Sequence, residues 1–186
     1  MSLAINVLIY QIVWFLCVFK GDAGAFFSLV LLIGHLLWSP LRKADLQMML
    51  ILLLAGLAID GAISYAGLIS YRVDGVPIPF WLAVIWLALA ILPNHSLRWL
   101  KGRPLLSSLF AALGGPLAYW AGVKAGSAFF NTTLFTAVAL LAIVWAFFWP
   151  LAMGIANRIA PRDAGGSKHH RAMKKAGTFS ALQGKL

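Results

Sequence analysis

Carboxylate and imidazole side chains, which can move protons or bind polar ligands, occur inside long apolar stretches of this sequence. Asp60 stands in "LAIDGAISYAG", and His95 follows Asn94 in "PNHSLRWLKGRP". Another histidine, His35, lies just before "LLWSP". Because such groups are costly to bury without a partner, each of these positions is a candidate for function.

The composition excludes a soluble domain and predicts membrane helices. Of the 186 residues, 62% are hydrophobic, and the chain has no glutamate. Apolar stretches recur at about the 20 residues that a helix needs to cross the hydrocarbon core of a bilayer. The stretches are continuous rather than alternating, which favours helices over a β-barrel. We therefore expect an all-α, polytopic membrane protein.

Six transmembrane helices are predicted in a domain that covers residues 1–159. They are expected at residues 3–19, 23–38, 46–69, 80–97, 105–125 and 132–156. Glycine, proline and charged residues separate them, as in "KGDAG" and "SYRVDGVPIP". Residues 160–186 are predicted to form a basic, disordered, cytoplasmic tail.

The distribution of Lys and Arg predicts that both termini are cytoplasmic. The loops on one side carry five basic residues and the tail adds seven, whereas the other side carries three. Cytoplasmic loops are enriched in Lys and Arg, and an even number of helices places both termini on that side. This asymmetry explains most of the formal charge of +10, so no nucleic-acid partner is expected. Membrane lipids are the expected partners, and the tail could hold anionic ones.

Four polar residues from three predicted helices are expected at one level near the cytoplasmic face. With a helical rise of about 1.5 Å per residue, Asn6, His35, Asn94 and His95 all fall in the inner half of the membrane. Taken alone, the presence of His35 in an apolar stretch is explained by a hydrogen bond to a neighbouring helix.

Pro93 should open the end of the fourth predicted helix. It lacks an N–H, so the carbonyl of Leu89 should lose its partner and the helix should bend. Asn94 and His95 follow directly, and Arg98 lies at the cytoplasmic exit. This pattern predicts a site for a polar or anionic headgroup. The alternative is that Asn94 and His95 cap the helix and meet interfacial water.

Asp60 is expected about two thirds of the way toward the outer face, with Ser64 on the same side of its helix. The stretch "GGPLAYWAG" brings Gly114 and Gly115 near mid-membrane and Tyr119 to the level of Asp60. We expect the carboxyl group to be neutral and hydrogen-bonded to Tyr119 or Ser64, or paired with a basic residue from the outer rim. The polar groups should therefore form two clusters, one above the other.

The sequence offers no motif that completes a catalytic mechanism. It contains no phosphate-binding loop, zinc-protease motif, serine-hydrolase motif or acidic pair for a catalytic metal. Cys17 is the single cysteine, which excludes a disulfide or a cysteine-based metal site within one chain. A zinc ion held by His35, His95 and Asp60 would require all three at one level. We therefore expect no metal and no cofactor, and no catalytic residue is assigned.

Several of these segments together resemble a known family. "YQIVWF", "LAIDGAISYAG", "PNHSLRWLKGRP" and "GGPLAYWAG" make the chain similar to the bacterial inner-membrane proteins of domain-of-unknown-function family 2878, over nearly everything before the tail. The resemblance implies a small multi-pass protein of the inner membrane. It also implies a frequent association with genes for fatty-acid modification, and it implies no established activity.

Three functions are compatible with these features. The first, which we favour, is binding or translocation of a lipid or another small amphipathic molecule through polar groups at two depths. The second is a membrane-embedded enzyme that acts on acyl chains or isoprenoids, with Asp60 or His95 as acid or base. The third is a membrane scaffold that recruits soluble lipid-modifying enzymes through its basic tail.

Overall fold

The computed structural model describes residues 3–161, which contain five α-helices and two short strands. The helices are α1 (Leu3–Trp38), α2 (Arg42–Tyr65), α3 (Phe80–Leu89), α4 (Pro104–Lys124) and α5 (Leu134–Ile159). A single 3₁₀ turn, Arg98–Leu100, lies between α3 and α4. Except for its first two residues, the predicted tail lies outside the described part of the chain.

Four helices, α1, α2, α4 and α5, are long and apolar enough to cross a membrane. The expected class, a multi-pass α-helical membrane protein, is therefore confirmed. The expectation of six separate helices is not, because residues 3–161 form five. The largest differences lie at the first predicted break and in the fourth predicted helix, and α2 begins and ends four residues earlier than predicted.

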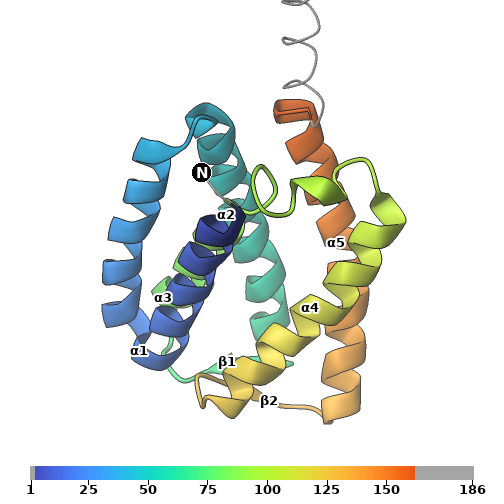
Figure 1. Cartoon of the computed structure of the whole chain (residues 1–186). Helices are drawn as coiled ribbons and strands as arrows, with labels where there is room; N and C mark the ends of the chain where they lie inside the picture. Colours follow the sequence, from blue (N-terminus) through green and yellow to red (C-terminus); the bar gives the residue numbers. More distant parts are fainter. Residues whose placement is uncertain (1–2, 162–186) are drawn as a thin grey trace, which may run out of the picture.

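The first two predicted helices form a single kinked element, α1, which reverses direction at Gly21. Gly21 has φ 58° and ψ −136°, a conformation that glycine adopts readily and other residues avoid. The Sγ atom of Cys17 lies 3.7 Å from Oγ of Ser28, whereas 11 residues of straight helix would separate them by about 16 Å. A side chain at Gly24 would collide with the backbone of the first limb, since its Cβ would lie 2.0 Å from the carbonyl oxygen of Leu16. Figure 1 shows the resulting hairpin of a first limb (residues 3–20) and a second limb (residues 22–38).

The fourth predicted helix is shorter than expected, because α3 ends at Leu89 and the chain continues in tight turns. Pro93 has no N–H to donate, as expected, but the carbonyl of Leu89 keeps a partner. It accepts from the N–H of Leu92 at 3.2 Å. The prediction that the carbonyl of Leu89 is unpaired was therefore wrong, because a tighter turn supplies a donor. The backbone N–H groups of His95 and Leu97 then both bond to the carbonyl of Leu92.

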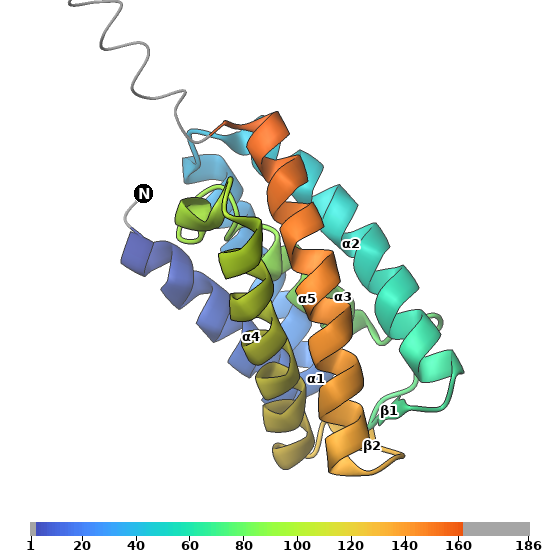
Figure 2. The ribbon, with the colours of Figure 1, turned by 90° about the vertical axis from the view of Figure 1, so that its right-hand side faces the viewer.

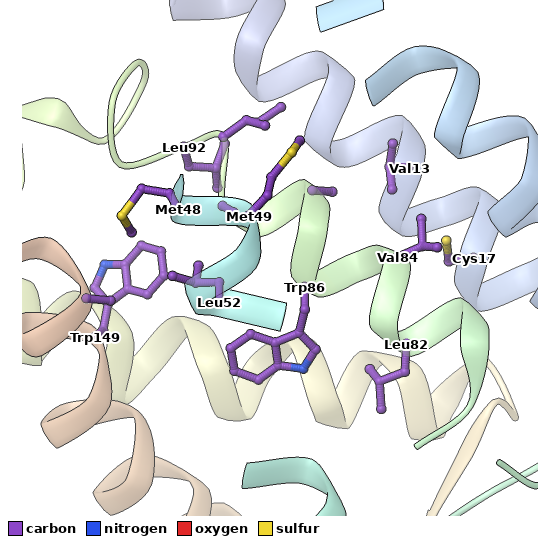
Figure 3. Packing of buried hydrophobic residues seen from close by; sticks show 14 of the residues in the cluster. Val13, Cys17, Met48, Met49, Leu52, Leu82, Val84, Trp86, Leu92 and Trp149 are labelled. Atoms are coloured by element: carbon purple, nitrogen blue, oxygen red, sulfur yellow. The ribbon is translucent and has the colours of Figure 1, made fainter. Parts of the chain in front are cut away.

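Helix α3 lies at the centre of the bundle and packs against both α1 and α2. Helices α4 and α5 form a second packed pair, which lie side by side in Figure 2. Figure 3 shows the core where these elements meet. Buried apolar side chains there come from α1, α2, α3, the turn after α3 and α5; they include Val13, Cys17, Met48, Leu52, Val84, Trp86, Leu92 and Trp149.

A small antiparallel sheet joins the two halves at one end of the bundle, where the sequence predicts the end of the helix 46–69 and two loops; α2 ends earlier, at Tyr65. Strand β1 (Ile69–Tyr71) follows α2, and β2 (Ala128–Phe130) follows α4, with Tyr71 opposite Ala128. The sheet closes the end opposite the beginning of α2 and the end of α5 (Figure 1). It also places Tyr71 beside the interior of the bundle.

Candidate functional site

The end of α1, the start of α2 and the turns after α3 bring three titratable side chains together. We call them the His35–Asp45–His95 cluster. The Oδ2 atom of Asp45 lies 2.9 Å from Nε2 of His95 and 3.4 Å from Nε2 of His35. The two imidazole rings meet edge to face, with centroids 5.0 Å apart. All three side chains are buried, so this polar group is sheltered from both water and lipid.

Hydrogen bonds fix the Asp45 carboxylate in its place. The amide nitrogen of Asn94 donates to Oδ1 at 3.0 Å, and the hydroxyl of Ser39 donates to Oδ2. The tight turn between α1 and α2 positions Ser39, whose Oγ accepts from the N–H of Leu41. The carboxylate is therefore held by the turn between α1 and α2 and by the segment after α3.

Lys101 links this cluster to the end of α5. Its Nζ atom donates to Asn94 Oδ1 at 2.7 Å and to the carbonyl oxygens of Ala156 and Ala160 at 3.0 and 2.8 Å. The last carbonyls of a helix have no partner within the helix, and a lysine is a favourable donor to them. Burial, with added repulsion from Arg98, lowers the pKa of Lys101 to about 8.

Asn6 joins the first limb of α1 to the turns that follow α3. Its side-chain nitrogen donates to the carbonyl of Ile91 at 3.3 Å, and its side-chain oxygen accepts from the N–H of Ser96 at 3.1 Å. These turns leave backbone groups without helical partners, and a fully buried asparagine can satisfy one donor and one acceptor. Asn6 therefore explains how irregular backbone is tolerated inside the bundle.

A second buried carboxylate, Asp60, lies toward the sheet end of the bundle. The indole N–H of Trp86 donates to its Oδ2 at 2.7 Å, and the hydroxyl of Tyr119 donates to its Oδ1. Gly56 makes room for the Trp86 ring, because a Cβ at this position would lie 2.4 Å from the indole. Asp60 is thus paired with neutral donors from α3 and α4. Burial and the nearby Asp60 carboxylate also raise the pKa of Tyr71, on β1, well above its usual range.

An apolar cavity of about 630 Å³ lies between the first limb of α1, α3, α4 and α5. It extends from Ser96 and Leu97, next to the inner turns, to Ser127 and Ala128 at the sheet. Five tryptophans line it: Trp14, Trp81, Trp86, Trp145 and Trp149. Trp86 and Tyr119, the partners of Asp60, form part of its wall.

The apolar cavity opens onto the apolar outer surface of the bundle. Phe15 on the first limb of α1 and Leu117 on α4 both line it, and their exposed fractions are 48% and 61%. In a membrane helix such exposed apolar side chains face the lipid. The cavity is therefore accessible from the hydrocarbon layer between α1 and α4.

A second cavity, of about 1000 Å³, lies on the other side of the turns after α3. Four basic residues line it, namely Arg42, Lys43, Arg98 and Lys101. Ser39 and Asn94, both partners of Asp45, also line this basic cavity. The basic cavity therefore lies next to two partners of the His35–Asp45–His95 cluster, although none of the three cluster residues lines it.

The comparisons with known proteins place the chain in a family. The model of the family described as "Protein of unknown function (DUF2878)" matches residues 3–151. The chain belongs to the DUF2878 family. No curated protein and no solved structure matches the chain.

In this DUF2878 protein, three of the inner residues predicted to share one level lie close together. His35 and His95 are in ring contact, and Asn94 bonds to the same carboxylate as His95. Asn6 bonds to the backbone of the same segment from the other side. Arg98 begins the 3₁₀ turn and lines the basic cavity.

The outer residues are only partly brought together in this DUF2878 protein. Tyr119 bonds to Asp60, as predicted, whereas Ser64 lies one turn beyond it and is not among the partners found for Asp60 within residues 3–161. Gly114 lines the apolar cavity and has open space beside it. Gly115 is buried, and its missing side chain accommodates the Trp145 ring, since a Cβ would lie 2.3 Å from that ring.

Sequence reasoning missed Asp45, Lys101 and Trp86. Asp45 falls just before the predicted helix 46–69, although it lies in the first turn of α2 and is buried. A signal was available, because the short connection between two apolar stretches forces the end of one helix beside the start of the next. Lys101 falls between the predicted helices 80–97 and 105–125, where a solvated charge is typical, but it is buried beneath the end of α5.

Proposed function

We propose that this protein binds a lipid or another small amphipathic molecule in the inner membrane, with the apolar part of the ligand in the cavity between α1, α3, α4 and α5. The observation that carries the proposal is the cavity itself. Its volume of about 630 Å³ lies within the range of roughly 300–1,000 Å³ that ligand pockets occupy. Its wall is predominantly apolar and aromatic, as such pockets are.

The polar groups on the wall support a ligand with a polar end. Trp149 is buried and lines the cavity, and its ring N–H has no hydrogen-bond partner in the part of the chain described. The hydroxyl of Ser96, at one end of the cavity, also has no hydrogen-bond partner within residues 3–161, whereas the hydroxyl of Ser127, at the other end, already donates to the carbonyl of Gly122. A ligand with an oxygen acceptor, such as a carboxylate, ester or hydroxyl group, would therefore find donors within an otherwise apolar site.

For the arrangement in the membrane, we propose six crossings with both termini in the cytoplasm. The two limbs of α1, helix α2, helix α3 with the turns after it, α4 and α5 each supply one crossing. The hairpin at Gly21 supports this arrangement, as does the start of α1, which lies in the same half of the bundle as the last turn of α5 (Figure 1). A C-terminal alkaline phosphatase fusion would then be inactive, and activity would contradict the topology.

A matched pair of glycine substitutions tests the binding proposal. At both Gly114 and Gly154 a new Cβ meets no atom within 4 Å, but only Gly114 lines the cavity. Gly114→Phe should therefore fill the cavity, whereas Gly154→Phe should add the same ring to an outer face of α5. Both variants and the wild type are purified in the same detergent, and the retained lipids are extracted and quantified by mass spectrometry.

The wild type and Gly154→Phe should retain the same bound species in similar amounts. Gly114→Phe should retain at least about tenfold less, which corresponds to about 1.4 kcal/mol of binding free energy. Equal retention by all three proteins would contradict binding in this cavity. Equal thermal unfolding midpoints for the two variants would show that a loss of lipid does not result from misfolding.

A further inference from the structure

The His35–Asp45–His95 cluster has the composition of a metal site. One ring nitrogen from each histidine and one carboxylate oxygen all lie within 4.8 Å of one another. We propose that these three residues bind a divalent transition-metal ion of the zinc class. The proposal is independent of the apolar cavity, which none of the three residues lines.

The distances fit a common metal ion. Zinc binds histidine nitrogen and carboxylate oxygen at about 2.0–2.2 Å, so two ligands of a tetrahedral ion lie about 3.4 Å apart. The carboxylate oxygen lies 3.4 Å from the nitrogen of His35 and 2.9 Å from that of His95. The ligating nitrogens of the two histidines lie within 4.8 Å of each other, so rotation of the imidazoles would have to set their final separation.

His35 gives the second, independent observation. It is buried, with 2% of its surface exposed, and neither of its ring nitrogens has a hydrogen-bond partner within residues 3–161. Its contact with Asp45 is 3.4 Å, longer than the usual N–H···O distance of about 2.7–3.2 Å. A buried polar atom left unpaired is costly. A metal ion between His35 and Asp45 would give Nε2 of His35 a partner.

The surrounding residues support the ligands as the outer partners of metal sites do. Asn94 donates to the other oxygen of Asp45, and Ser39 donates to the oxygen that faces the histidines. Such partners orient a ligating carboxylate and fix its charge. Asn94 is in turn held by Lys101. The carboxylate is thus already oriented for coordination.

Three protein ligands would leave the coordination of the ion incomplete, and a fourth ligand would come from the side of the basic cavity. Three protein ligands leave one position of a tetrahedral zinc ion open, as in catalytic zinc sites. Ser39 and Asn94 border both the cluster and the basic cavity. A divalent ion with a single carboxylate keeps a positive charge, and Arg42 and Lys43 add to it nearby. The open position should therefore take water, hydroxide or an anionic ligand.

The test measures metal bound to the full-length chain, purified with a tag that contains no histidine. Zinc content is determined by inductively coupled plasma mass spectrometry, and Co²⁺ is added to the metal-depleted protein as a spectroscopic probe. His169→Ala/His170→Ala serves as the control for zinc held by the tail. The wild type and this control should each bind one metal ion per chain.

Loss of an outer partner of a metal ligand costs about 10- to 100-fold in affinity. Asp45→Asn and His35→Ala each remove a ligand itself, so each should weaken Zn²⁺ binding by at least about 100-fold. His95→Cys keeps a ligand, and its Co²⁺ complex should gain the charge-transfer absorption of a thiolate bound to the metal. His95→Cys gives a positive signal even if His35→Ala does not fold. A wild-type chain without stoichiometric metal, or unchanged Zn²⁺ affinity in Asp45→Asn, would overturn the proposal.

Discussion

Replacing Asp60 should separate the requirement for its charge from the requirement for its hydrogen bonds. The carboxylate accepts from Trp86 on α3 and from Tyr119 on α4. Asn keeps an oxygen that can accept from the indole, and its amide nitrogen can donate to the Tyr119 hydroxyl. Leu has a similar shape and offers no acceptor. Asp60→Asn should therefore be tolerated, whereas Asp60→Leu should leave both donors unpaired.

The expected loss of stability follows from the number of donors. A buried donor without a partner costs about 1–3 kcal/mol, so Asp60→Leu should lose about 2–6 kcal/mol. Hydrogen bonds between membrane helices average about 0.6 kcal/mol, which sets a lower limit of about 1 kcal/mol for the pair. Asp60→Asn should lose at most one hydrogen bond, about 0.5–1.5 kcal/mol. Asp60→Leu/Tyr119→Phe removes one of the orphaned donors and should recover part of the loss.

The free energy of unfolding can be measured by SDS titration in mixed micelles, followed by circular dichroism. The expected order of stability is wild type, Asp60→Asn, the double variant and then Asp60→Leu. If Asp60→Asn is as unstable as Asp60→Leu, hydrogen bonding is not what Asp60 contributes. If Asp60→Leu is as stable as the wild type, the two contacts carry no stability.

Three further predictions concern other parts of the bundle. Gly56→Ala should destabilise the protein by about 1–3 kcal/mol, because its Cβ would lie 2.4 Å from the Trp86 ring, while Gly34→Ala, with open space beside it, should be neutral in the same SDS titration. Asn6→Ala leaves one buried backbone donor and one acceptor unpaired and should lower the unfolding free energy by about 2 kcal/mol or more; an unchanged value would contradict the role given to Asn6. The pKa of Lys101 in the folded state, about 8, lies below its ordinary value of 10.5. Between these two pH values the unfolded chain binds more protons than the folded chain, so the free energy of unfolding should rise with pH from about 8 to 10.5. Thermal unfolding at several pH values should show a smaller rise of stability with pH in Lys101→Met than in the wild type. An identical pH profile in the two proteins would contradict this prediction.

The position of the first chain reversal was predictable, but its form was not. The charged and glycine-rich stretch "KGDAG" predicts a break between two apolar segments. The structure places the break at one residue, Gly21, so that the two limbs remain parts of one element. A single glycine in a left-handed conformation can reverse the chain, and only tertiary packing reveals that it does. The predicted helix 80–97 was too long, because α3 ends at Leu89 and tight turns replace the rest of it.

The depth of a polar residue in the bundle could be predicted better than the identity of the residues that it contacts. Counting the helical rise places Asp60 and Tyr119 at one level, and the structure pairs them. Trp86 was missed because the rotation of α3 about its axis depends on packing, which here follows from the space left at Gly56. Asp45 was missed because its helix begins at Arg42, earlier than the apolar run suggests. A charge near the end of a helix can face inward when another helix end supplies its partners.

Photo-crosslinking in the membrane tests most directly whether the cavity holds a lipid chain. A fatty acid with a diazirine near the middle of its chain would be fed to cells that express the full-length protein, and the modified residues would be mapped by mass spectrometry. Ala111 and Leu92 line the cavity and are only 4% and 6% exposed, so lipids around the bundle cannot reach them readily. Modification at these residues, reduced by excess unlabelled fatty acid and lost in Gly114→Phe, is the predicted result. Modification confined to outward-facing residues such as Phe135 and Leu151, with the same pattern in Gly114→Phe, would contradict a ligand in the cavity.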